Sequence, residues 1–174
     1  MNKLHELFLT FFYFGNSKIA PGTVGSAATV GFWLCVTTLF VANDVNWLWQ
    51  TSFWVIFCIF SFYYGVFASP LYMKYKKSKT VDQKSIVLDE VVGQIIALQI
   101  GYLYLFEGFF IDTTITAYHL SASFILFRFF DIYKPSIIGT IDKNLKCGLG
   151  VMLDDVIAGL AAGFVVLIGW WVIL

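Results

Sequence analysis

Five acidic residues border apolar segments of this 174-residue chain, and their spacing indicates a shared site. They are Asp89, Glu90, Asp131, Asp154 and Asp155. Carboxylates gathered in one place repel one another, and a divalent cation between them relieves that repulsion. Mg²⁺ suits such a site because it prefers oxygen ligands and keeps several of its waters. Acids at helix starts also favour the helix dipole, so capping is the alternative explanation for any one of them.

Basic and hydroxyl side chains accompany these acids and could bind a phosphate group. They are Lys18, Thr23, Ser26, Arg128 and Lys134. Residues 20–26, APGTVGS, form a Gly/Pro loop that opens a predicted helix, and free backbone N–H groups at such a start bind anions readily. The chain has two histidines and three cysteines without the spacing of a zinc site, which disfavours zinc and disulfides. Carboxylates beside cations predict phosphoryl chemistry on a lipid headgroup.

Apolar segments long enough to cross a membrane must position these residues, since a span needs about 20 mainly apolar residues. Five segments fit: 23–41, 47–68, 91–110, 113–130 and 156–174. The first of them either spans or re-enters, and the shorter run 4–14 predicts an interfacial or re-entrant helix. We therefore expect one domain over residues 1–174, an all-α polytopic membrane helix bundle with four or five transmembrane helices and a short interfacial N-terminal helix.

The composition agrees with membrane insertion. Hydrophobic residues make up 59% of the chain, charged residues 13%, and the mean hydropathy is +0.80. Soluble domains are about one quarter charged, so this chain would expose too much apolar surface in water. The net charge is zero and the basic residues are scattered, which disfavours nucleic-acid binding.

The distribution of lysine and arginine predicts the orientation. The segments 69–90 and 131–155 carry lysines, whereas the turns 42–46 and 107–112 contain neither lysine nor arginine. Positive residues favour the cytoplasmic side, which places the N-terminus and the acidic residues there and the C-terminus outside.

Four motifs together resemble the phosphatidylglycerophosphatase A family. They are KIAPGTVGS at 18–26, IVLDEVVG at 86–93, FRFFDIYKP at 127–135 and GLGVMLDDVIAG at 148–159. They follow the order of the family and extend over most of the chain. Two positions depart from it: Asp82-Gln83 stands where the family often has Asp-Pro, and Cys147-Gly148 where it often has paired glycines.

The resemblance implies a Mg²⁺-dependent phosphatase of the bacterial cytoplasmic (inner) membrane. It would hydrolyse the anionic phospholipid phosphatidylglycerophosphate to phosphatidylglycerol and phosphate at the cytoplasmic face. On this basis the five acids are expected to hold Mg²⁺, directly or through its waters, and one of them to act as general base. The five basic and hydroxyl residues named above would bind the substrate phosphate. Attack by water is the default, and a phospho-aspartyl intermediate stays open.

A small divalent-cation transporter or channel using the same carboxylates is the alternative function. Transport sites tend to lie near the bilayer midplane on broken helices, whereas these acids lie at helix ends. The GxxxG spacing of Gly159 and Gly163 permits close helix packing within one subunit or between two copies in a homo-oligomer.

Overall fold

The structure is a computed structural model that describes residues 3–75, 85–105, 113–134 and 148–173. Within these ranges it contains six α-helices and one 3-10 helix, and no strand. The elements are α1 (Lys3–Leu9), η1 (Phe14–Asn16), α2 (Pro21–Ala42), α3 (Trp47–Tyr75), α4 (Leu88–Leu105), α5 (Thr113–Tyr133) and α7 (Gly148–Ile173). The all-α prediction with a short N-terminal helix is thereby confirmed. The lysines at 76–84 and the segments 106–112 and 135–147, used above for orientation, lie outside the described residues.

Three of the described helices are long and apolar enough to cross a membrane: Pro21–Ala42, Trp47–Tyr72 and Gly148–Ile173. The first segment, expected to span or re-enter, is a continuous helix that starts at Pro21. Proline suits this position because its fixed φ and missing N–H cost nothing at a helix start. α4 and α5 do not reach the same hydropathy over their described lengths, since α4 includes Gln94 and Gln99 and α5 begins with threonines.

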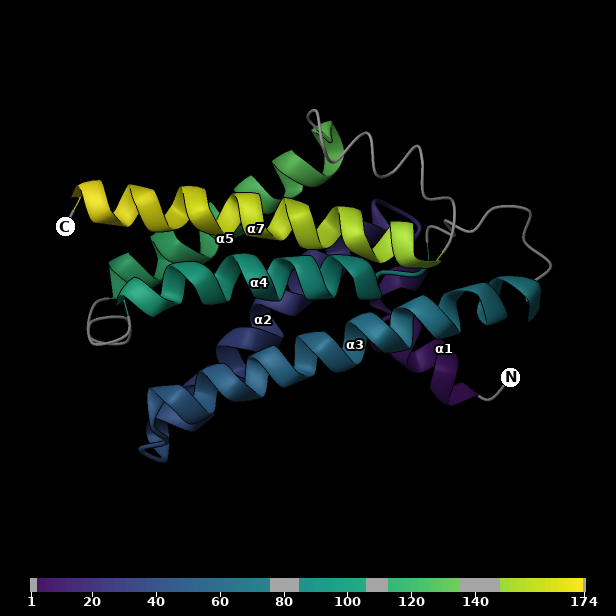
Figure 1. The fold of residues 1–174 in the computed structure, drawn as a ribbon, viewed down its shortest axis with the longest axis horizontal. Helices are drawn as coiled ribbons and strands as arrows, with labels where there is room; N and C mark the ends of the chain where they lie inside the picture. The colour runs from purple at the N-terminus through teal and green to yellow at the C-terminus, as the bar shows by residue number, and fades with distance from the viewer. Residues whose placement is uncertain (1–2, 76–84, 106–112, 135–147, 174) are drawn as a thin grey trace.

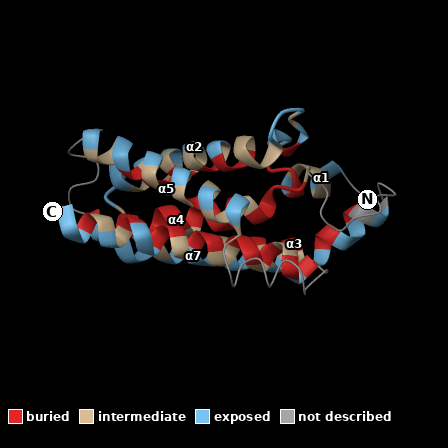
Figure 2. Ribbon diagram, turned by 90° about the horizontal axis from the view of Figure 1, so that it is seen from above, coloured by how far each residue is buried: buried red, intermediate tan, exposed pale blue. Residues whose placement is uncertain are grey.

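Helix α4 forms the centre of the bundle. It contacts α2, α3, α5 and α7, and most of its residues are buried (Figure 2). Its closest neighbour is α7, because glycines on both helices let their backbones approach. A side chain added at Gly163 would lie 2.9 Å from Ile100, and one at Gly159 would overlap the backbone of Gly93. The GxxxG spacing is therefore used inside one subunit, where α7 packs against α4.

The long helices alternate in direction. α2, α4 and α7 begin at one end of the bundle, and α3 and α5 finish there (Figure 1). Because the predicted acidic residues precede or follow these helices at the same end, the alternation brings them together. The turn between α2 and α3 and the end of α7 lie at the opposite end.

The N-terminal segment packs against α3 and the start of α4. The His5 ring and the Tyr64 hydroxyl are hydrogen-bonded at 2.6 Å, and the backbone N–H of Val87 donates to the Leu9 carbonyl at 3.0 Å. Phe11, Phe12 and Tyr13 have φ between 43° and 69°, a left-handed conformation that is rare for bulky residues. This turn carries the chain from α1 back to η1 beside the acidic end of the bundle.

A neutral polar network joins the helices in the half of the bundle farther from the acids. Trp33 Nε1 donates to Gln99 Oε1 at 3.2 Å, and Gln99 Nε2 donates to Thr51 Oγ1 at 3.3 Å. His119 Nε2 lies 3.1 Å from the Leu98 carbonyl, and Trp170 Nε1 donates to His119 Nδ1 at 3.4 Å. His119 is therefore a buried residue whose two ring nitrogens are both hydrogen-bonded within the bundle. α2, α3, α4, α5 and α7 all contribute to this network.

Candidate metal and phosphate site

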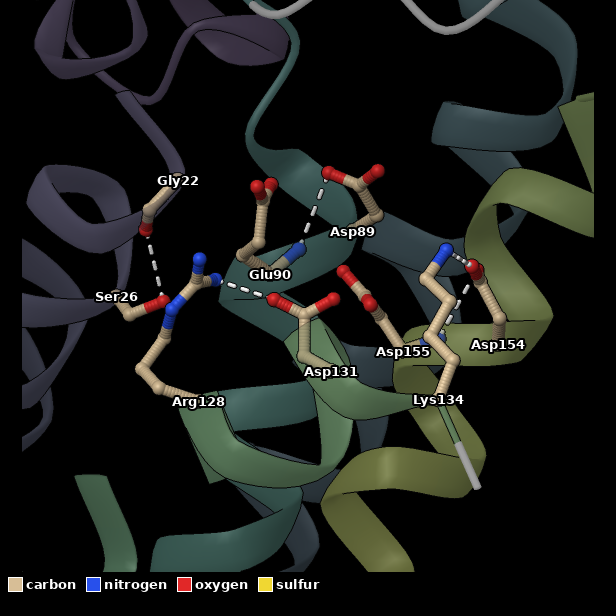
Figure 3. A network of polar contacts seen from close by, with 9 residues as sticks. All are labelled: Gly22, Ser26, Asp89, Glu90, Arg128, Asp131, Lys134, Asp154 and Asp155. Atoms are coloured by element: carbon tan, nitrogen blue, oxygen red, sulfur yellow. Dashed lines mark hydrogen bonds and ion pairs between the residues drawn. The ribbon is translucent and has the colours of Figure 1, made fainter. Parts of the chain in front are cut away.

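Three carboxylates from two helices meet at the acidic end of the bundle (Figure 3). Asp89 and Glu90 stand in the first turn of α4, and Asp155 stands in the second turn of α7. One oxygen from each lies within 4.8 Å of the others. Gly93 makes this approach feasible, because a side chain there would overlap the Asp155 carbonyl and lie 2.5 Å from Phe127.

The capping explanation fits only some of these acids. Asp89 and Glu90 do lie at the start of α4, where a negative charge favours the helix dipole. Helix α7 begins at Gly148, earlier than the apolar segment 156–174 indicated, so Asp154 and Asp155 lie beyond its first turn. The dipole effect has faded at that depth. Dipole stabilisation therefore leaves the buried Asp154 and Asp155 unexplained.

Helix α5 brings a cation and a fourth acid to the same place. Arg128 Nη1 forms an ion pair with Asp131 Oδ2, and both side chains are about 85% buried (exposed fractions 15% and 14%). The guanidinium also lies beside the start of α2, since a side chain added at Gly22 would lie 3.3 Å from both of its terminal nitrogens. The same added atom would overlap the Glu90 carboxylate. Gly22 is thus a site residue that the sequence did not identify, because its role depends on a close backbone approach.

The fifth acid has a partner of its own. Lys134 Nζ lies 2.5 Å from Asp154 Oδ2, at the point where α5 ends and the backbone of Lys134 turns to a φ of 42°. Asp154 is buried, and Lys134 is only partly exposed. Asp131 and Asp154 therefore flank the three-carboxylate group, each in an ion pair with one cation.

The remaining predicted phosphate-binding residues lie on or just before α2. Ser26 is buried and donates from Oγ to the Gly22 carbonyl at 2.9 Å, so its proton is used within the helix. Thr23 is half-buried, one residue after Gly22, and Lys18 is exposed in the segment that precedes the helix. The structure thus brings Ser26 beside Gly22 and leaves Lys18 on the surface near this end.

Burial and mutual repulsion dominate the electrostatics of Asp89 and Glu90, which precede the apolar part of α4. Burial raises the pKa of Glu90 to about 8, and the charges of Asp155 and Asp131 add to this while Arg128 opposes it. Burial also raises the pKa of Asp89 well above its ordinary value, and the charge of Glu90 adds to this effect. Both shifts show that the protein groups around Asp89 and Glu90 stabilise the negative charges of these carboxylates poorly.

The donor set fits a hard divalent cation. Three carboxylates in mutual reach offer the oxygen ligands that Mg²⁺ prefers, and a cation would offset their mutual repulsion. Glu90 Oε2 and Arg128 Nε are buried and have no hydrogen-bond partner within the described ranges. One is an acceptor suited to a cation, and the other is a donor suited to an anion. Three carboxylates beside an arginine thus form a candidate metal and phosphate site, in a helical bundle with three helices long and apolar enough to cross a membrane.

Comparison with known proteins identifies the family. The family model for phosphatidylglycerophosphatase A matches residues 7–170, which is most of the chain. The chain therefore belongs to the phosphatidylglycerophosphatase A family, as its motifs indicated.

Curated relatives cover nearly the whole sequence. Phosphatidylglycerophosphatase A of Escherichia coli K12 is 33% identical over 162 residues, covering 89% of this chain and 77% of the relative. The protein of that name from Haemophilus influenzae is 34% identical over 177 residues, covering 99% and 93%. A putative phosphatidylinositol-3-phosphatase of Bacteroides thetaiotaomicron is 32% identical over 164 residues, covering 94% and 92%. No solved structure matches the chain at a significant level.

Proposed function

We propose that this protein hydrolyses phosphatidylglycerophosphate to phosphatidylglycerol and phosphate, with Mg²⁺ as its cofactor. The observation that carries the proposal is the meeting of Asp89, Glu90 and Asp155 beside Arg128, in a chain of the phosphatidylglycerophosphatase A family. Carboxylates alone would repel a phosphate group, and an arginine alone would not hold a cation. Their combination supports phosphoryl transfer from an anionic lipid.

The residues divide into three roles. Asp89, Glu90 and Asp155 would hold Mg²⁺, which when bound supplies positive charge that stabilises the phosphoryl group in the transition state. Arg128 would donate hydrogen bonds to the phosphate oxygens, with Asp131 fixing the orientation of its guanidinium. Asp154 would fix Lys134 in the same manner. Asp131 and Asp154 were predicted as metal ligands, and their ion pairs favour this positioning role.

The chemistry itself is a hydrolysis. One of the carboxylates takes a proton from the attacking water while the water oxygen bonds to phosphorus. The bond between phosphorus and the headgroup oxygen breaks, and that oxygen receives a proton to become the free hydroxyl. Thr23 and Lys18, near the start of α2, remain predicted contacts of the phosphate, together with Ser26.

The names of the curated relatives indicate two possible headgroups for the lipid substrate. Two are named for phosphatidylglycerophosphate, and one carries the name of a phosphatidylinositol-3-phosphatase. Both substrates are lipid phosphomonoesters, so the same site chemistry serves either. We favour the glycerol headgroup because two of the three curated relatives bear its name.

The membrane arrangement follows from the alternating helices. We propose that α4 and α5 cross the bacterial cytoplasmic membrane together with α2, α3 and α7, giving five spans. The N-terminus and the site would face the cytoplasm, the C-terminus would lie outside, and α1 would lie at the interface. A C-terminal reporter that is active only outside the cytoplasm should be active on this protein. A reporter active only in the cytoplasm would reverse the orientation.

The first test is phosphate release by purified protein in detergent. Phosphatidylglycerophosphate and phosphatidylinositol 3-phosphate with the same acyl chains would be compared, each with Mg²⁺ and with EDTA. We expect faster release from the glycerol lipid, dependence on Mg²⁺, and loss in Asp155→Asn. Faster release from the inositol lipid would show that phosphatidylinositol 3-phosphate, and not phosphatidylglycerophosphate, is the preferred substrate. No release from either by well-folded protein would favour cation transport, which flux into liposomes measures.

A further inference from the structure

A cleft of about 240 Å³ opens between α2 and α5. Its lining comes from two residues of α2 and three of α5: Ala27, Val30, Leu120, Ser121 and Phe124. α2 and α5 touch each other at fewer points than either touches α4, which leaves this space between them. The lining is apolar apart from the Ser121 hydroxyl, and the cleft is open on one side.

The cleft lining begins about one helical turn from residues at the candidate site. Ala27 lies four residues after Thr23 on α2, and Phe124 lies four residues before Arg128 on α5. Residues four apart share one face of a helix, so both faces that meet at the site extend into the cleft. Four residues correspond to a rise of about 6 Å along the helix. The next position on the α2 face, Gly31, is exposed and has nothing within 4 Å of an added side-chain atom, so no side chain blocks the face beyond Ala27.

We propose that this cleft binds one acyl chain of the phospholipid substrate, an inference that rests on the proposed function. A lipid whose phosphate lies at Arg128 must direct its chains along the helices into the bilayer. The α2–α5 cleft offers an apolar path in that direction, and Arg128 of α5 stands one helical turn beyond its Phe124 wall. An anionic headgroup joined to an apolar chain complements this arrangement at both ends.

A second cavity shows why the position matters. A larger space of about 480 Å³ lies between α5 and α7, and its α7 lining runs from Val165 to Ile173. These residues belong to the last turns of α7, whereas Asp155 lies in its second turn. On α5 its lining runs from Tyr118 to Leu126, so the two spaces share that stretch of α5 and differ in their second wall. The second wall of the larger space lies far along α7 from Asp155, whereas the α2 wall of the smaller cleft begins six residues after the start of α2.

Photo-crosslinking tests where the chain lies without relying on turnover. The probe is phosphatidylglycerophosphate with a diazirine midway along one acyl chain, and the control is phosphatidylcholine with the same chain. We expect the phosphatidylglycerophosphate probe to label α2 around Ala27 and α5 around Phe124 more strongly than the control does. Equal labelling of all lipid-facing helices by both lipids would overturn the proposal.

A cleft-filling substitution gives the functional test. Ala27→Trp should raise KM for long-chain phosphatidylglycerophosphate by at least about 10-fold, because a filled pocket rejects the chain. The KM for a water-soluble analogue that keeps the phosphorylated headgroup and lacks acyl chains should stay unchanged. Ile56 of α3 is 66% exposed and lies outside the cleft, so Ile56→Trp should leave both KM values unchanged. An unchanged KM for the long-chain lipid in folded Ala27→Trp protein would overturn the proposal.

Comparison of the long-chain lipid with the soluble analogue also tells failure of the cleft proposal apart from failure of the proposed phosphatase function. Hydrolysis of both lipid and soluble analogue by the unmodified protein, with no effect of Ala27→Trp, rejects the cleft and keeps the phosphatase. No hydrolysis of either rejects the phosphatase, and the crosslinking pattern then decides the cleft independently. Ser121→Leu provides a second filling variant on α5 if the tryptophan prevents folding. Ser121→Leu should also raise KM for the long-chain lipid and leave KM for the soluble analogue unchanged.

Discussion

The bundle contains two polar regions that differ in how their groups are paired. The region at the start of α4 and α7 gathers charged groups, and it leaves Glu90 Oε2 and Arg128 Nε without hydrogen-bond partners in the described part of the chain. The region around Gln99 and His119 is neutral, and its side chains hydrogen-bond from helix to helix. Both lie in the same apolar bundle, so burial alone does not distinguish them.

The difference indicates what each region is for. Interhelical hydrogen bonds between neutral groups hold helices in register within a membrane. Buried carboxylates without enough compensation reduce stability, and such groups are retained where they bind a ligand. We therefore propose that the neutral network stabilises the bundle and that the charged region binds a cation and a phosphate. Four experiments test this division.

The largest effect is expected at Asp155. Asp155→Asn should lower phosphatase activity by at least about 100-fold, since the ligand itself matters more than its hydrogen-bonded surroundings. The melting temperature of the metal-free protein should not fall, because the change removes one of several repelling charges. Asp44→Asn, an exposed residue after α2 with φ 53° that asparagine tolerates, is the matched control. An active Asp155→Asn protein would contradict the site.

Addition of metal should separate the same two variants by stability. A cation that binds only the folded state stabilises it by about 2.7 kcal/mol at 100 times its Kd. Mg²⁺ should therefore raise the melting temperature of the unmodified protein and of Asp44→Asn, and leave that of Asp155→Asn unchanged. Equal shifts in all three proteins would show that the ion acts elsewhere.

A substitution at Gly22 should have a smaller effect on the activity of the charged region. Gly22→Ala places a methyl group against the Glu90 carboxylate and 3.3 Å from the Arg128 nitrogens. The displacement should lower kcat/KM by about 10- to 100-fold, as for other small misplacements of catalytic groups. Gly169→Ala in α7, where an added atom meets nothing within 4 Å, should keep the original rate. Equal rates for both variants would remove Gly22 from the site.

Two buried glutamines on α4 test whether the hydrogen bonds of the neutral region stabilise the bundle. Gln99→Leu removes hydrogen bonds to Trp33 and Thr51 and should lower the free energy of unfolding by about 0.5–2 kcal/mol. Gln94 is buried as well, but neither of its amide atoms has a partner among the described residues. Gln94→Leu should therefore leave stability unchanged or raise it. Unfolding in mixed micelles measures both, and an equal loss would contradict the division.

The sequence predicted which acids meet, and it did so for a simple reason. Helices that alternate in direction place every second boundary at the same end, so Asp89, Asp131 and Asp155 had to converge once the apolar segments were recognised. Helix α4 was recognisable as an apolar segment, but its central position was not. Its two glutamines and two acids lower its hydropathy, and only the packing shows that the other helices surround it.

Details that depend on backbone approach could not be predicted. Gly22 and Gly93 matter because of what lies opposite them, which no local pattern encodes. The start of α7 at Gly148 was missed because the glycines and acids at 148–155 lowered the apolar signal. The ion pairs of Asp131 and Asp154 depend on side-chain reach across helices or along one turn, which charge spacing alone does not indicate.

The position of Asp155 on the last helix has a consequence for biogenesis. Asp89 and Glu90 are translated and inserted well before α7, so the nascent protein carries their charges without the carboxylate that completes the group. On the proposed function, activity would arise only when the final helix docks against α4. A chain whose synthesis stops before α7 would lack Asp155 and would leave the face of α4 around Gly93 without the helix that packs on it.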